Sequence, residues 1–132
     1  MIEVGQTFET RHVFSQADFN RFAELSGDDN PIHVDPAFAA STHFGGTVSH
    51  GMLLYSVLSG AINAHIPGAR QLTQEMMFPT GTYTGEEIVI RIVVNSVDAE
   101  KREALLDVST VRPTGDAGLT GQMRIRLPEV RQ

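Results

Sequence analysis

Apolar residues recur at helical spacing near the start of the chain and predict two short helices. In residues 15–27, SQADFNRFAELSG, the apolar stripe consists of Phe19, Phe22, Ala23 and Leu25. Asp18 stands three residues after Ser15, which is the spacing of a capping box at the start of a helix, and the glycine that closes the segment ends it. A second helix is predicted to begin at Pro36, because Asp35 can cap its N-terminus and proline is favoured at the first helical position.

The longest helical pattern covers residues 51–68, GMLLYSVLSGAINAHIPG, and is closed by Pro67 and Gly68. Its apolar residues fall on nearly every face of the helix. A helix that is apolar all round is stable when other elements bury it all round. We therefore expect this helix to lie at the centre of the protein, enclosed by the remaining elements.

The second half of the chain alternates between apolar and polar positions, which is the period of strands with one buried face. The alternation is clean in residues 88–94, IVIRIVV, and in residues 119–127, LTGQMRIRL, and it is weaker in residues 104–112, ALLDVSTVR. A further strand is predicted within residues 4–14. The links between the later strands are short, which makes neighbouring strands antiparallel. An antiparallel sheet wrapped around one long helix predicts a single α+β domain over residues 1–132.

Composition narrows the class of partner. The formal net charge is −6, and the ten lysine and arginine residues are scattered, whereas nucleic-acid binding needs them clustered. The chain has no cysteine, which excludes disulfides and thiolate chemistry and is typical of the reducing cytosol, so a cytoplasmic location is expected. The most apolar segment, residues 52–66, is shorter than the roughly 20 residues that a membrane span needs. Neither nucleic acid nor a membrane is an expected partner.

Residues 25–36, LSGDDNPIHVDP, hold an unusual concentration of functional side chains. One interpretation is structural: the acidic and amide groups cap and turn the backbone, and His33 is incidental. The other interpretation is a general acid/base pair of Asp28 and His33, because histidine titrates near neutral pH and a carboxylate beside it can share a water molecule. Pro31 forces Asn30 out of helical geometry and would stiffen the corner that carries both groups.

The segment S-G-D-D-N-P-I-H, residues 26–33, resembles the signature of the MaoC-like family, whose best-known members are (R)-specific enoyl-CoA hydratases. Residues 48–56, VSHGMLLYS, resemble the H-G-M-L segment that opens the central helix of that family. The resemblance extends over nearly the whole chain in the order of its elements. It implies a hot-dog fold, an antiparallel sheet wrapped around a long central helix, in a homodimer that acts on a coenzyme A or acyl-carrier thioester.

Two positions depart from the pattern of the family. Relatives often carry an F-x-x-P stretch before a strand, where this chain has F-P-T-G at residues 78–81, with glycine in place of the last proline. Tyr55 is bulkier than the small residue expected after H-G-M-L-L. Both departures concern the shape of the acyl pocket and not the reacting groups.

The resemblance implies hydration of a trans-2-enoyl thioester to a (3R)-3-hydroxyacyl thioester, or the reverse dehydration, without a cofactor or a metal. His33 is expected to act as the base and Asp28 to orient the same water, and which of them delivers the α-proton is left open. Gly51 begins the long helix, where unpaired backbone N–H groups and the helix dipole favour the negative charge of an enolate oxygen. The residues expected to contact the substrate are Asn30, Met52, Tyr55, Ser59 and Ile62.

The acyl chain is expected to follow the helix face that continues from Gly51, because residues three and four positions apart share a face. Tyr55 lies one turn after Gly51, and Ile62 lies further along the same face. Both are therefore expected to limit the length of the acyl chain, which favours short substrates. The alternative is that Tyr55 packs sideways into the core or into a dimer contact.

Other functions remain open on the sequence. A thioesterase would use the same carboxylate, water and helix N-terminus, because hot-dog folds host both activities. A non-catalytic acyl-binding subunit would keep the fold and lose turnover. A metal site built from the carboxylates and histidines of residues 28–43 (Asp28, His33, Asp35, His43) lacks a typical metal-binding spacing. His50 is interpreted as a structural residue at the start of the long helix, and the remaining histidines have no evident partner: His12, His43 and His65.

Overall fold

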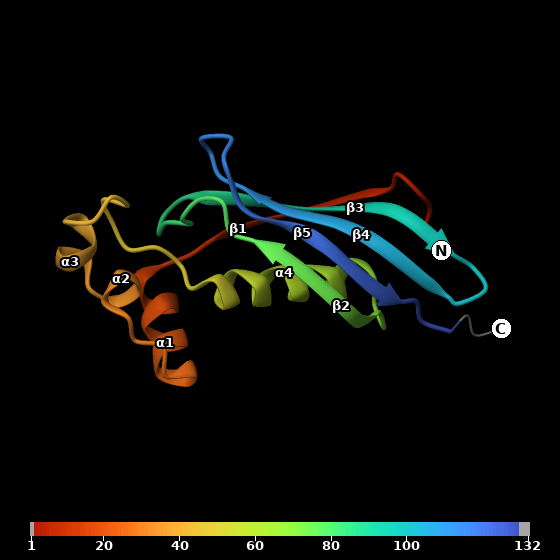
Figure 1. Cartoon of the computed structure of the whole chain (residues 1–132), viewed down its shortest axis with the longest axis horizontal. Coiled ribbons are helices and arrows are strands. Elements are labelled where there is room, and N and C mark those ends of the chain that lie inside the picture. Colours follow the sequence, from red (N-terminus) through yellow and green to blue (C-terminus); the bar gives the residue numbers. More distant parts are fainter. Residues whose placement is uncertain (1, 130–132) are drawn as a thin grey trace.

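The computed structural model of the chain describes residues 2–129 (Figure 1). In chain order its elements are β1 (Thr7–Val13), α1 (Gln16–Ser26), α2 (Pro31–Val34), α3 (Pro36–Ala40), α4 (Gly51–His65), β2 (Arg70–Met77), β3 (Glu87–Asp98), β4 (Glu103–Val111) and β5 (Ala117–Arg126). Helix α1 begins at the predicted capping box, in which Ser15 and Asp18 each accept the backbone N–H of the other. The described residues contain no helix that is long and apolar enough to cross a membrane.

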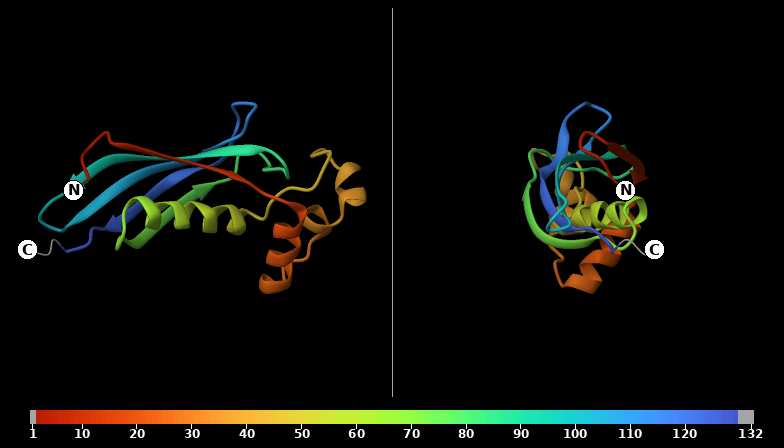
Figure 2. Two further views of the ribbon diagram at one scale, coloured as in Figure 1. Left: turned by 180° about the vertical axis from the view of Figure 1, so that it is seen from behind. Right: turned by 90° about the vertical axis from the view of Figure 1, so that its right-hand side faces the viewer.

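The five strands form one antiparallel sheet in the order β1-β3-β4-β5-β2. Short hairpins join β3 to β4 and β4 to β5, as the short links in the sequence predict. Viewed from the end, the sheet curves around α4, which lies along its inner face (Figure 2). Helices α1, α2 and α3 gather at the end of the molecule where α4 begins. This arrangement confirms the predicted α+β, hot-dog architecture.

The apolar core lies between the sheet and one face of α4. Alternate residues of β3 are fully buried, as the sequence predicts: Ile88, Ile90, Ile92 and Val94. Strand β4 alternates more regularly than its sequence suggests, because its buried positions include Thr110 as well as aliphatic residues. Residues of α4 complete the same cluster: Leu54, Leu58, Ala61 and Ile62. The core therefore fixes the position of α4, and with it the position of the helix N-terminus.

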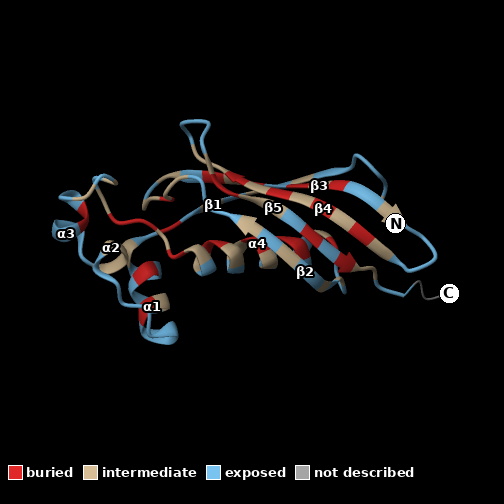
Figure 3. Cartoon of the chain, in the orientation of Figure 1, coloured by how far each residue is buried: buried red, intermediate tan, exposed pale blue. Residues whose placement is uncertain are grey.

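Helix α4 is not enclosed on all sides, so that prediction is wrong. An exposed stripe runs along the helix at positions three and four residues apart: Met52, Ser56, Gly60 and Asn63. Apart from Met52, which is 56% exposed, these residues are small or polar. The high apolar content of the segment masks this narrow face, which Figure 3 shows as the uncovered side of α4. The helix also ends at His65, three residues before the predicted end.

Strand β2 has no counterpart in the sequence analysis. None of its eight residues is buried, and it forms one edge of the sheet with β5 as its strand neighbour. A register shift between Gln71 and Thr73 interrupts its pairing with β5. An edge strand without a buried face has no period-two apolar pattern, which is the signal on which strand prediction depends.

Candidate active site

Asp28 and His33 lie on either side of a stiff corner between α1 and α2. Gly27 ends α1 in the left-handed conformation with φ 78°, which glycine adopts without strain. Asn30 then caps α2 with φ −52° and ψ 130°, and its Oδ1 accepts the N–H of Ile32 at 3.1 Å. The proline that follows Asn30 favours this extended geometry, as predicted. The corner brings the carboxylate and the imidazole to the same side of the chain.

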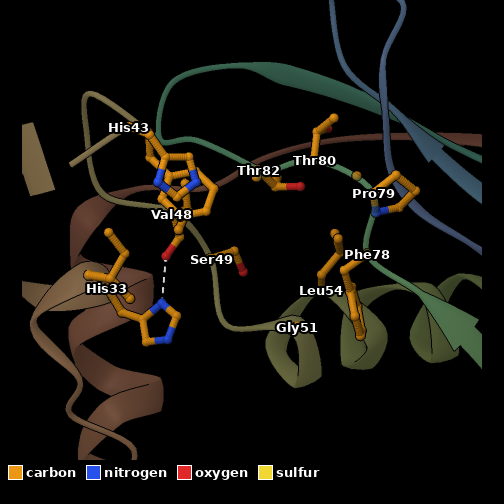
Figure 4. A pocket seen from close by; sticks show the side chains of 14 residues that line it. His33, His43, Val48, Ser49, Gly51, Leu54, Phe78, Pro79, Thr80 and Thr82 are labelled. Atoms are coloured by element: carbon orange, nitrogen blue, oxygen red, sulfur yellow. Dashed lines mark hydrogen bonds between the residues drawn. The ribbon is translucent and has the colours of Figure 1, made fainter.

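The His33 side chain has one nitrogen fixed and one nitrogen free. Its Nδ1 lies 2.8 Å from the carbonyl oxygen of Val48 (Figure 4), which can only accept, so in the neutral ring Nδ1 carries the proton and Nε2 holds a lone pair. That Nε2 lies 4.0 Å from Oδ2 of Asp28. This distance is too long for a direct hydrogen bond and suits two groups that bind one water molecule.

His50 lies directly behind this pair. It is the residue before the first turn of α4, and it is only 2% exposed. Its Nε2 donates to the backbone carbonyl oxygen of Asp28 at 2.8 Å, and its ring stacks on that of His33 with the centroids 3.8 Å apart. Burial lowers the pKa of His50 below its ordinary value, and the nearby charge of His33 lowers it further, whereas the hydrogen bond that His50 donates to the Asp28 carbonyl raises it. His50 is therefore an uncharged ring at neutral pH.

Within the part of the chain that the structure describes, one group of side chains has the spacing of a metal site. Ligand atoms of Asp28, His33 and His50 lie within 4.8 Å of one another. The two imidazoles each use one nitrogen on a backbone carbonyl. Their stacked planes are only 25° from parallel, so the in-plane lone pairs do not converge on one ion at metal-bond distance. This arrangement favours acid/base chemistry over metal binding.

Gly51 provides the second functional feature of this region, the N-terminus of α4. No side chain caps this end of the helix, so its first backbone N–H groups are available to an oxygen of a ligand. A β-carbon at Gly51 would lie 2.8 Å from Cζ of Phe78. Glycine is thus the residue that lets the Phe78 ring lie directly against the helix N-terminus.

A pocket of about 390 Å³ opens between these groups (Figure 4). His33 and Ile32 of α2 form one side, Gly51 and Leu54 of α4 form the floor, and the segment 78–82 forms the opposite side. The lining is a mixture of apolar surface and hydroxyl groups, which suits a short carbon chain carrying one polar group. His33 and Gly51, the first residue of α4, both border this one space.

The departure at Gly81 affects the wall of the pocket. A β-carbon at Gly81 would lie 2.6 Å from Cγ1 of Val48 and 3.1 Å from Cδ1 of Phe44. A proline at this position would meet both neighbours, so glycine permits Val48 to approach closely. Since Val48 also holds the His33 ring through its carbonyl, this close contact braces the segment that orients His33.

The structure brings some of the predicted site residues together and separates others. His33 and Gly51 line the pocket, and Asp28 faces His33 from the exposed side. The predicted substrate contacts lie outside the pocket of this single chain. Asn30 caps α2, Met52 is exposed, and Ile62 is fully buried in the core. Their roles in binding stay predictions.

Tyr55 and Ser59 belong to a polar cluster between α4 and β2. The Tyr55 hydroxyl donates to Oε1 of Gln71, and Nε2 of Gln71 donates to the Ser59 hydroxyl. Gln71 reaches the helix from the irregular part of β2. Tyr55 thus points along the sheet side of α4 and not into the pocket beside His33.

Several residues that line the pocket have no signal in the sequence, among them His43, Ser49 and Thr82. They come from loops, where no periodic pattern predicts which side chains meet. Phe78 and Thr80 of the F-P-T-G stretch also line the pocket; the sequence connects this stretch with the shape of the acyl pocket but does not indicate that it faces α2. His50, which the sequence suggests is structural, has its ring against that of His33.

Comparison with known proteins shows which family the chain resembles. Residues 2–113 match the MaoC like domain. The chain is 36% identical over 129 residues to an (R)-specific enoyl-CoA hydratase of Aeromonas caviae, with 96% of each chain covered. It is 34% identical over 110 residues to a mitochondrial 3-hydroxyacyl-[acyl-carrier-protein] dehydratase of Arabidopsis thaliana, which covers 83% of this chain and 66% of the relative.

Solved structures agree with these sequence matches. The structure of the (R)-hydratase from A. caviae involved in PHA biosynthesis superposes with a TM-score of 0.91 at 36% identity. The match covers 96% of this chain and 98% of that one. Both the sequence and the fold of this chain are therefore similar to those of the A. caviae hydratase over nearly the whole chain.

Proposed function

The chain belongs to the MaoC-like domain family and is an enzyme of the hydratase and dehydratase class, and we propose that Asp28 and His33 catalyse its reaction. The substrate is a trans-2-enoyl thioester and the product a (3R)-3-hydroxyacyl thioester, or the reverse. The observation that carries the proposal is the 4.0 Å separation of His33 Nε2 and Asp28 Oδ2, beside a pocket that also reaches Gly51.

In the direction of hydration, a water molecule between the two side chains gives one proton to Nε2 of His33. Its oxygen bonds to the β-carbon of the substrate, and the electron pair of the double bond moves onto the thioester as an enolate. The enolate oxygen accepts the Gly51 N–H at the start of α4, a contact worth a factor of about 10² to 10³ in rate. A proton from the acid/base pair then reaches the α-carbon and restores the thioester. Positioned proton transfer of this kind contributes roughly 10²- to 10⁴-fold.

The thioester carrier is either coenzyme A or an acyl carrier protein. The A. caviae relative is named for a coenzyme A substrate and the A. thaliana relative for an acyl-carrier substrate. The lack of a cysteine supports a cytoplasmic location for this chain. No cofactor enters the proposed reaction, because both the added hydroxyl and the added hydrogen come from water.

We further propose that the enzyme works as a homodimer. The outer edge of β2 has no strand neighbour among the described residues, and exposed apolar side chains lie on or next to it: Leu72, Met77 and Phe78. An open strand edge of this kind is a surface for pairing with another chain. In a two-fold symmetric dimer, the β2 edges of the two subunits would cover each other.

One assay tests the proposed reaction against its alternatives. Crotonyl-CoA is mixed with the enzyme, and both the absorbance of the conjugated enoyl group and the free thiol are followed. Loss of absorbance without thiol release is the expected result. Release of thiol would indicate a thioesterase, which the fold could also support. No change with enoyl substrates of several lengths would indicate an acyl-binding subunit without turnover.

A further inference from the structure

We propose that His50 is a positioning residue that holds both Asp28 and His33 in place for the reaction. The inference rests on the proposed function, because it assigns a role to the residue behind the two groups that the function uses. It goes beyond that function by extending the active site to a buried side chain that touches no substrate. Three observations support it.

The first observation is the hydrogen bond to Asp28. The Asp28 side chain is 56% exposed, and packing alone holds such a side chain loosely. Within its own loop, Asp28 is tied by the bond of its N–H to Oγ of Ser26 at 3.1 Å. The bond from His50 Nε2 to the Asp28 carbonyl, 2.8 Å long, ties this loop to α4, and it comes from a residue that is almost fully buried. His50 thus fixes the backbone from which the carboxylate projects.

The second observation is a cluster of three rings. Phe22 of α1 contacts His50 with the centroids 4.8 Å apart and the planes tilted by 58°, and His33 stacks on His50 at 3.8 Å. The edge of the His33 ring is held by the Val48 carbonyl, two residues before His50. The segment 48–50 therefore restrains His33 both in the plane of the ring and across it. A base whose ring cannot turn keeps Nε2 directed at the same point.

The third observation concerns charge. His50 Nε2 donates its proton to a carbonyl, and Nδ1 is buried without a hydrogen-bond partner among the described residues. A second proton on Nδ1 would therefore be buried without an acceptor, which is costly. Burial and the charge of His33 also lower the pKa of His50. His50 consequently stays uncharged while His33 holds the proton taken from water, and it does not compete for that proton.

Two substitutions separate the hydrogen bond from the ring. His50→Gln keeps an uncharged amide donor at a similar reach and removes the ring. His50→Phe keeps a flat ring in contact with Phe22 and His33 and removes the donor. His65→Phe is the matched control, since His65 lies at the other end of α4 and bonds to Oγ1 of Thr10.

We expect His50→Phe to lower kcat for crotonyl-CoA hydration by about 10²-fold with little change in KM, because a misplaced catalytic group costs that much. His50→Gln should recover part of the loss, because it restores a donor to the Asp28 carbonyl but not the ring that stacks on His33, and His65→Phe should keep the wild-type kcat. A folded His50→Phe enzyme with wild-type kcat would overturn the inference, and so would a folded His50→Gln enzyme as slow as His50→Phe.

Ring ¹⁵N chemical shifts of the wild-type enzyme test the same inference without any variant. The expected signal for His50 is a neutral ring protonated at Nε2 at pH 7. A charged ring, or a ring protonated at Nδ1, would overturn the inference. Asp28→Asn and His33→Ala separate this failure from failure of the proposed function. If these two variants keep turnover, the proposed function is refuted. If they lose turnover while His50→Phe keeps it, only the role of His50 is refuted.

Discussion

The Phe78 ring lies against Gly51 so closely that a β-carbon on Gly51 would be 2.8 Å from Cζ of Phe78. Because the N–H of Gly51 is the proposed donor to the enolate oxygen, this contact joins the wall of the pocket to the proposed catalytic group. Alanine keeps this N–H, but we expect Gly51→Ala to displace the Phe78 ring and the position of the substrate, and so to lower kcat/KM by about 10²-fold, the loss that a misplaced reacting group causes.

The control for Gly51→Ala is Gly60→Ala in the same helix. A β-carbon at Gly60 meets nothing within 4 Å, so this change should leave activity intact and raise stability by roughly 0.5–1 kcal/mol. Thermal unfolding and steady-state kinetics measure both variants. Equal kinetics for the two variants would contradict the role of Gly51.

Asp28→Asn and His33→Ala should each lower kcat by at least about 10²-fold, because each removes one member of the proposed acid/base pair. Asp29→Asn is the matched control, since Asp29 is an exposed neighbouring carboxylate outside the Asp28, His33 and His50 group. Circular dichroism checks that all three variants fold. Near-normal hydration by either of the first two would refute the assignment.

His50 should make stability depend on pH. Its pKa is lowered from 6.5 by burial first, so between the folded and unfolded pKa values the unfolded chain binds more protons. The contribution of His50 is therefore complete above pH 6.5 and is lost as the pH falls through the interval below 6.5, with a slope of up to about 1.4 kcal/mol per pH unit. Urea unfolding of wild type and His50→Gln between pH 5 and pH 8 measures this difference. Parallel curves for the two proteins would show that no such linkage exists.

Tyr55 lies outside the pocket beside His33, and we expect it to restrict acyl chains that extend beyond this pocket into the space between α4 and β2. Its hydroxyl bonds to Gln71, and Gln71 bonds to Ser59, so the three side chains close the space between α4 and β2. Tyr55→Ala should raise kcat/KM for C8 and C10 enoyl-CoA relative to C4, and Tyr55→Phe should raise it less because the ring remains. A uniform loss at all lengths would leave Tyr55 with a packing role, which is the alternative that the sequence left open.

The dimer prediction is tested at the β2 edge. Leu72→Lys places a charge on the unpaired strand, and two-fold symmetry would bring the two charges into one interface. Leu25→Lys on α1 is the control, because Leu25 is 82% exposed far from that edge in sequence. Light scattering at micromolar concentration should show a dimer for wild type and Leu25→Lys and a monomer for Leu72→Lys. A monomeric wild type would contradict the proposal.

Much of the fold could be predicted from local patterns. The capping box at Ser15 and the alternation of β3 each depend on residues close together in the chain, and the structure confirms both. Strand β2 could not be predicted, because neither of its faces is buried. The open face of α4 was missed because small residues such as Gly60 share a helix with many large apolar ones.

In the candidate site, too, only the relationships between residues close together in the chain could be predicted. Asp28 and His33 belong to one short motif around Pro31, so the sequence alone can place them together. The stacking of His33 on His50 depends on how residues 34–47 fold back, and no short pattern encodes that path. Pocket residues such as Thr82 are brought in by the sheet from more than 30 positions away.

The two sides of the pocket come from separate parts of the chain: Asp28 and His33 precede α4, and the segment 78–82 forms the opposite wall. The five strands supply none of the proposed acid/base groups. Two residues of that wall nevertheless contact the catalytic side: Phe78 lies against Gly51, and Gly81 lies against Val48. For evolution or engineering, libraries aimed at new acyl groups therefore belong in residues 78–82, with Phe78 and Gly81 kept so that the proposed catalytic groups stay in place.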